Sequence, residues 1–105
     1  MIALQQANRI VLCGRLIELD TLRHTPAGVP VVKFRIQHDS TQTEGRGERK
    51  VSCEIAAVAF EREAKLLAAA KPGSMLTATG FLAAKSQTSR IPVLHATQIE
   101  FEPGE

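Results

Sequence analysis

A chain of 105 residues, with 44 % hydrophobic and 23 % charged residues, has the size and composition of one globular domain. No apolar stretch approaches the roughly 20 residues that a membrane helix requires, and the start MIALQQANR lacks the segments of a secretory signal. We therefore expect a cytoplasmic protein with a single domain over residues 1–105, with short frayed ends near 1–6 and 102–105; the formal net charge of +2 excludes no class of partner.

The first part of the chain predicts two strands separated by a turn. Residues 8–19 are rich in Ile, Val and Leu, and the central Gly14 is typical of a strand that bends in a closing sheet. Residues 20–28 collect turn-forming residues. Residues 29–38 then alternate, with Val32, Phe34, Ile36 and His38 on one face and Lys33, Arg35 and Gln37 on the other. This period of two predicts a strand covered on one side only, with a basic outer face.

The second part predicts a hairpin, a helix and two more strands. Residues 39–50 contain two glycines and no apolar residue, so we expect a long mobile hairpin loop before a strand over 51–60. Acids near the start, Ala and Leu in the middle and Lys71-Pro72-Gly73 at the end predict a helix over 61–70, with Leu66 and Leu67 facing the core. Strands over 74–85 and 91–101 flank the polar turn 86–90.

This order of elements, three strands, one helix and two strands, is the order of the OB-fold. That fold is an all-β, five-stranded Greek-key barrel with one helix between its third and fourth strands. Its second and third strands, with the loops that follow the first and fourth strands, bind oligonucleotides or oligosaccharides. We therefore predict an OB-fold domain with a binding groove on this face.

The sequence gives no support for an enzyme, a metal site or a cofactor. None of His24, His38 and His95 stands at a ligand-like spacing from a carboxylate or a cysteine, and phosphate-loop and nucleophile-elbow motifs are missing. His38 and His95 are interpreted as structural histidines. Cys13 and Cys53 stand singly in apolar runs and are expected to be buried free thiols.

Basic residues fall on the parts of the OB-fold that surround its groove. From residue 23 to residue 90 the chain has eleven basic and six acidic residues, a net charge of +5, whereas the stretch after Arg90 has three acids and no Lys or Arg. The candidate nucleic-acid-binding residues are Arg23, His24, Lys33, Arg35, Arg46, Arg49, Lys50, Ser52, Phe81, Lys85 and Arg90. Such a surface suits a phosphate backbone, which makes binding salt-dependent. The alternative is an ordinary solvated surface.

Aromatic residues are scarce for a protein that binds single strands. The chain has four Phe, no Trp and no Tyr. Phe34, Phe60 and Phe101 are interpreted as core residues, which leaves Phe81 as the one candidate for stacking on a base or for an interface. Each stacked base contributes roughly 1–3 kcal/mol in such proteins. We therefore expect weak, mainly electrostatic binding without base specificity.

Several motifs resemble known families. Residues 8–38 resemble the start of bacterial single-stranded DNA-binding proteins, and residues 72–82 look like their fourth strand. The closer resemblance is to the PriB family, primosomal replication protein N. The matching motifs are Asn8-Arg9, Gly28-Val29-Pro30, Phe34, His38-x-Ser40, Cys53, Gly80-Phe81 and the stretch VLHATQIE at 93–100.

The resemblance implies a homodimeric OB-fold protein that acts in replication restart. It would bind single-stranded DNA and the PriA helicase, and it would act before the DnaT and DnaC loading machinery. Arg23 or His24, Lys85 and Arg90 match basic groove positions of the family. Ser52 stands where relatives carry a stacking Trp, and Asp39 stands at a position that is basic in relatives.

These departures, with a shorter and less basic loop at 85–90, predict that contacts with the helicase carry a larger share of the function. The alternative is a protein-interaction module that docks replication proteins and binds little DNA of its own. An exposed first strand would offer an edge for a dimer.

Overall fold

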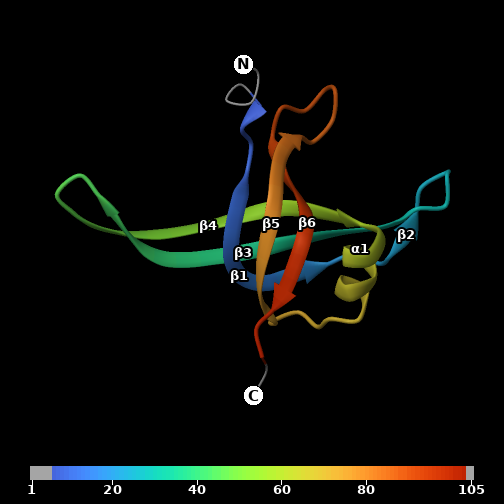
Figure 1. Ribbon diagram of the computed structural model, residues 1–105, viewed down its shortest axis with the longest axis horizontal. Helices are drawn as coiled ribbons and strands as arrows, with labels where there is room; N and C mark the ends of the chain where they lie inside the picture. Colours follow the sequence, from blue (N-terminus) through green and yellow to red (C-terminus); the bar gives the residue numbers. More distant parts are fainter. Residues whose placement is uncertain (1–5, 104–105) are drawn as a thin grey trace.

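The computed structural model describes residues 6–103, which form a small barrel, one helix and a long two-stranded arm (Figure 1). The elements are β1 (Ile10–Leu19), β2 (Arg23–His24), β3 (Pro30–Glu44), β4 (Gly47–Phe60), α1 (Glu61–Ala68), β5 (Met75–Ala84) and β6 (Pro92–Phe101). The expected frayed ends fall mainly on residues 1–5 and 104–105, which lie outside the described residues. Within 6–103, no helix is long and apolar enough to cross a membrane.

The barrel closes because β1 pairs with two different strands. Residues 10–15 of β1 lie antiparallel to β5, and residues 15–19 lie antiparallel to β3. The remaining neighbours are β5 with β6, β6 with β4, and β4 with β3, and β4 and β6 run parallel. The five-stranded OB-fold with its helix between the third and fourth barrel strands is confirmed.

The core fills the barrel and extends beneath α1. Its largest fully buried side chains are Leu16, Val32, Ile36, Leu67, Leu76 and Leu94. The helix packs on β3, β4 and β6 and buries Ala64 and Leu67, while Leu66 is only half-buried. Gly14 is required where β1 bends across β3, because a Cβ there would lie 2.5 Å from the carbonyl oxygen of Gln37.

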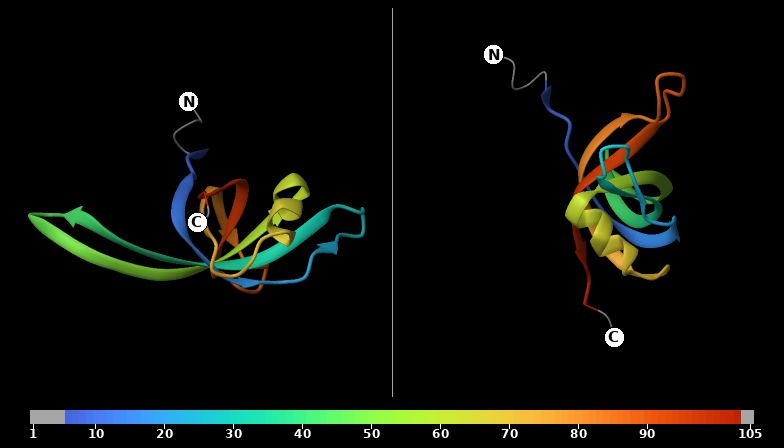
Figure 2. Two further views of the ribbon diagram at one scale, coloured as in Figure 1. Left: turned by 90° about the horizontal axis from the view of Figure 1, so that it is seen from below. Right: turned by 90° about the vertical axis from the view of Figure 1, so that its right-hand side faces the viewer.

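The hairpin predicted over residues 39–50 is present, but its description as a loop is wrong. These residues continue β3 and β4 as a regular antiparallel ribbon as far as the pair Glu44 and Gly47, and Gly45 makes the turn with a φ of 62°. We call residues 39–52 the arm; it projects from the barrel on the side away from α1 and β2 (Figures 1 and 2). Residues 41–50 are all exposed. The loop was expected because these residues include no apolar side chain. That lack reports exposure on both faces and does not exclude a strand that extends beyond the core. The hairpin itself is favoured by a two-residue turn that begins with Gly.

Two further expectations need correction. The turn region 20–28 contains β2, which pairs with residues 30–31 of β3; two residues are too few to give a periodic signal.

Cys13 and Cys53 are both exposed rather than buried. Cys13 lies on the outer phase of β1, between buried Gly14 and half-buried Leu12, and Cys53 directly follows the arm, where β4 enters the barrel. Burial was expected because both cysteines have apolar neighbours in the sequence. Successive side chains of a strand point to opposite faces, so a buried neighbour does not make the next residue buried.

Asn8 extends the sheet with its side chain. Its Nδ2 donates to the carbonyl oxygen of Leu82 at 2.8 Å, and the backbone N–H of Leu82 donates to its Oδ1 at 2.9 Å. The amide therefore mimics one more residue pair next to the start of β1. Asn8→Ala should lower the free energy of unfolding by about 1–2 kcal/mol, because both exposed hydrogen bonds are lost. Urea denaturation measures this change as a lower midpoint at an unchanged m value.

A matched variant tests the geometry of this bond pair. Asn8→Asp keeps the acceptor oxygen but places a second carboxylate oxygen against the carbonyl oxygen of Leu82. Two acceptors repel each other, so its midpoint should be no higher than that of Asn8→Ala. Equal midpoints for all three proteins would show that Asn8 does not hold the sheet.

Candidate nucleic-acid interface

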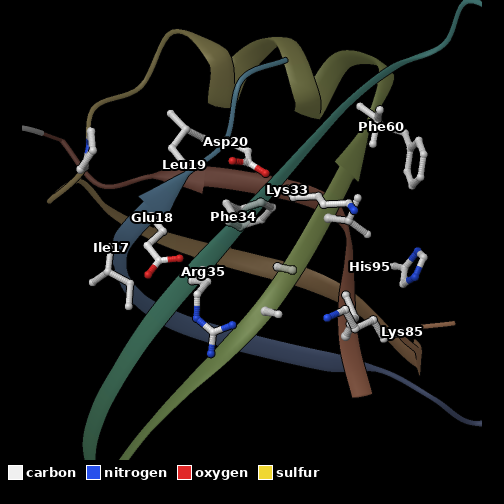
Figure 3. A pocket seen from close by; sticks show the side chains of 16 residues that line it. Ile17, Glu18, Leu19, Asp20, Lys33, Phe34, Arg35, Phe60, Lys85 and His95 are labelled. Carbon is white, nitrogen blue, oxygen red and sulfur yellow. The ribbon is translucent and has the colours of Figure 1, made fainter. Parts of the chain in front are cut away.

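A groove of about 780 Å³ runs over the outer face of β3, β4 and β6 (Figure 3). Residues of β1 form one border, and Lys85, directly after β5, belongs to its lining. This is the face that the OB-fold predicts for ligand binding.

One row of side chains crosses the outer face of four strands. In the strand register, Lys33 on β3 lies opposite Val58 on β4, Val58 opposite His95 on β6, and His95 opposite Phe81 on β5. Directly opposed residues project to the same face of a sheet. The row therefore places a cation at one end and aromatic rings at the other.

The charge of the groove is smaller than the sequence suggested. Lys33, Arg35 and Lys85 line it, but so do the carboxylates of Glu18 on β1 and of Asp20 directly after it. Glu18 is the register partner of Arg35, and the Nε of Arg35 lies 3.5 Å from the Oε1 of Glu54. The charge count along the sequence did not reveal that these acids face the cations. They reach the same face only when β1 pairs with β3 and closes the barrel.

Three aromatic rings stack at the edge of the groove, and two of them, Phe60 and His95, belong to its lining. The His95 ring lies 5.1 Å from the Phe81 ring with 11° between their planes, and 6.3 Å from the Phe60 ring with 20° between their planes. Phe60 and Phe81 are each 40 % exposed, so the interpretation of Phe60 as a core residue is wrong. We call Phe60, His95 and Phe81 the aromatic stack.

The sequence did contain a signal for Phe60. The buried residues Ala57 and Ala59 have the opposite phase to Phe60, so continued alternation along β4 directs Phe60 outward. The position of Phe60 at the strand–helix boundary obscured this. His95 gave no comparable signal, because its contacts with Phe60 and Phe81 join residues far apart in the sequence.

Comparison with known proteins agrees with this architecture. A family model described as another single-strand binding protein family matches residues 8–98. The replication restart protein PriB of Nitrosomonas europaea is 33 % identical over 84 % of this chain and 82 % of its own. That of Bordetella pertussis is 36 % identical over 87 % of this chain and 85 % of its own. The chain belongs to the PriB family.

Solved structures extend the PriB comparison. The PriB protein of Ralstonia solanacearum superposes with a TM-score of 0.83 at 31 % identity, covering 92 % of this chain and 99 % of its own. A small single-stranded DNA-binding protein of Streptomyces coelicolor shares the fold, with a TM-score of 0.72 at 16 % identity over 92 % of this chain and 94 % of its own.

The PriB motif His38-x-Ser40 has a structural role here. The Nδ1 of His38 lies 2.7 Å from the carbonyl oxygen of Cys13, to which it donates in the neutral tautomer that accepts from Ser40. The Nε2 lies 2.7 Å from the Oγ of Ser40. The hydrogen-bonded structural histidine is confirmed: it fastens β3 to β1 at the point where β3 leaves the barrel.

The predicted binding residues of this PriB-family chain occupy three regions. Among the described residues, the groove itself takes in only Lys33, Arg35 and Lys85 of that set, with Phe81 in the adjoining stack. Arg23 shares a small pocket with Asp20 and Lys33, and His24 is exposed on β2. Arg90 is exposed in the connection between β5 and β6.

The arm carries the remaining four predicted residues, Arg46, Arg49, Lys50 and Ser52. Three basic and three acidic residues leave the arm without net charge. The Nη1 of Arg49 lies 3.3 Å from the Oε1 of Glu44, and the Oγ of Ser52 accepts a hydrogen bond from Gln37 at 3.0 Å. The arm is therefore a polar extension without net charge, in which the predicted cations are balanced by acids.

Proposed function

We propose that this protein is a non-enzymatic accessory of DNA replication restart that binds single-stranded DNA in the groove and stimulates the PriA helicase. Membership of the PriB family and the position of Lys33, Arg35 and Lys85 on the ligand-binding face support this function. It requires no cofactor, and we place it in the cytoplasm, where replication takes place. The observation that carries the proposal is the three cations lining one groove on this face.

The binding is proposed to be weak and mainly electrostatic, with the cations of the groove contacting the phosphates of the strand. Three cations on a single strand predict a slope of about −2 when the logarithm of the binding constant is plotted against that of the salt concentration. Fluorescence polarisation with a labelled oligonucleotide across a salt series measures this slope. An affinity that does not change with salt would contradict the proposal.

Stimulation of PriA is a separate part of the proposal. On forked DNA, adding the protein should raise the rate of unwinding by PriA until the effect saturates. DnaT is proposed as a further partner that acts after this step. An unwinding rate that stays constant up to saturating protein would remove the proposed role.

A second function is favoured by the low net charge of the groove and the neutral arm. Both would suit a module that docks replication proteins and binds little DNA of its own. The two functions separate in binding assays with groove variants, because DNA binding and helicase contact are measured independently.

The protein is proposed to form a homodimer through β1. Within residues 6–103, the stretch 10–14 of β1 pairs with β5 on one side and offers its other edge unpaired. Val11 in this stretch is 55 % exposed, and an open edge invites a second strand. The mass in solution should therefore correspond to two chains of 11.4 kDa. A mass of one chain at assay concentrations would contradict the dimer.

The acids of the groove make a testable prediction for DNA binding. Replacing Glu18 by Gln and Asp20 by Asn removes two negative charges that oppose the phosphates, so affinity at low salt should rise roughly threefold. Fluorescence polarisation measures the change. Glu48→Gln with Glu100→Gln removes two negative charges at exposed positions that do not line the groove, so this matched control should leave the affinity close to that of the wild type. Equal effects of the control and the groove variant would show that the acids act only through total charge.

A further inference from the structure

We propose that the aromatic stack of Phe60, His95 and Phe81 is a base-stacking site for the unpaired nucleobases of single-stranded DNA. This inference rests on the proposed function and deepens it. The sequence left Phe81 as the only candidate aromatic, and the stack adds two rings from two other strands to it. The protein then holds its ligand through bases as well as phosphates.

The geometry of the stack matches the preferred packing of π systems. Both ring pairs are within 20° of parallel, with centroid separations of 5.1 and 6.3 Å. Offset-stacked rings prefer separations of about 4.5–7 Å. The two outer rings, Phe60 and Phe81, are each 40 % exposed, so each retains ring surface on which a base can continue the stack.

The backbone fixes the three rings from different strands. β5 and β6 approach so closely at Gly80 that a Cβ there would overlap the carbonyl oxygen of His95, and this contact brings Phe81 against His95. Phe60 ends β4, and the next residue, Glu61, has a φ of 59°. This left-handed conformation is uncommon for a residue other than Gly, and such strain concentrates at binding sites. The chain therefore turns sharply into α1 after Phe60.

The position of the stack suits a nucleotide strand. His95 and Phe60 belong to the lining of the groove, and Figure 3 shows them on the same side of it as Lys85. Lys33 stands in the same cross-strand row as His95 and Phe81. A base on the stack would therefore leave its phosphates within the part of the groove that Lys33 and Lys85 line. Two carboxylates oppose the three cations in the groove and weaken its attraction for phosphates. Stacking of bases on uncharged rings would add binding energy that these acids do not reduce.

The experiment compares two oligonucleotides that differ only in their bases. One is an oligothymidylate, and the other has the same length and phosphates but abasic sugars. The wild type should bind the oligothymidylate about tenfold more tightly at the same salt concentration, which is the effect of one stacked base. In the variant Phe60→Leu, Phe81→Leu this difference should vanish while the salt dependence stays as in the wild type.

Met75→Ala provides the matched control. Met75 is an exposed apolar residue near the start of β5, outside the groove, so its variant should keep the tenfold difference. Thermal unfolding of each variant checks that it is folded. The variant Phe81→Trp gives a second readout that does not depend on the leucine variants, because the chain has no other Trp. Its fluorescence should be quenched by the oligothymidylate and unchanged by the abasic strand.

The outcomes separate the stack from the proposed function. Equal, salt-dependent binding of both oligonucleotides by the wild type would overturn base stacking and leave the DNA-binding function intact. A base-dependent difference that survives in the double Leu variant would also overturn this site. Failure to bind either oligonucleotide at low salt would contradict the proposed function itself, and the stack with it.

Discussion

Replacing Lys33, Arg35 and Lys85 together by alanine should weaken binding of a single-stranded oligonucleotide on the order of a hundredfold at low salt. Each lost cation removes one released counterion, so the dependence of affinity on salt should become nearly flat. Fluorescence polarisation of the triple variant across a salt series measures both quantities. These three residues are the cations that the barrel brings into one groove.

The arm offers a control with the same change in charge. Arg46, Arg49 and Lys50 are exposed and lie beyond the barrel, so replacing all three by alanine should weaken binding far less than the groove variant. Comparable losses in the two triple variants would mean that DNA follows total charge and not the groove. If the groove variant keeps its DNA affinity and loses only its contact with PriA, the groove is a docking site for protein.

Gly80→Ala should have the largest effect on stability. An added Cβ would overlap the carbonyl oxygen of His95 and lie 2.8 Å from its carbonyl carbon and 3.1 Å from the Cα of Ala96. All three are backbone atoms, which cannot rotate away, so β5 and β6 must separate at their bulge. The free energy of unfolding should fall by about 3 kcal/mol, the upper end of the usual cost of overpacking. For a domain of this size this lowers the melting temperature by roughly 15 °C.

Gly47→Ala is the matched substitution. Gly47 has open space around the position of a Cβ and does not have a positive φ, so its variant should melt within a few degrees of the wild type. If the two alanine variants have the same melting temperature, the close approach at Gly80 is not required by the fold.

The elements of the barrel could be predicted from the sequence because one face of each strand is buried. The alternation from Val32 to Ile36 and the change of period after Phe60 give local signals, and the order of elements then indicates the OB-fold. The arm could not be predicted in this way. Its residues lie beyond the core, so a strand there leaves no hydrophobic alternation, and only the Gly-containing turn marks the hairpin.

The candidate site was predicted in its position and only partly in its composition. Lys33 and Arg35 could be predicted because they lie on the outer phase of one strand. Lys85 could be predicted because the OB-fold places the loop after its fourth strand beside the groove. The opposing carboxylates Glu18 and Asp20 and the contacts of His95 arise when distant strands pair, so no local pattern reports them. The expectation of mainly electrostatic binding came from this limit, because the sequence showed the charges and only one of the three rings, Phe81, as a candidate for stacking.

The most direct test of the central claim locates the bound strand on the protein. In an NMR titration of backbone amides with a single-stranded oligonucleotide, the largest shift changes should follow the row of Lys33, Val58, His95 and Phe81 and include Lys85. Changes that cluster instead on the arm, or around Met75 and Phe101 at the other end of the β5–β6 pair, would contradict the proposal that the groove binds single-stranded DNA.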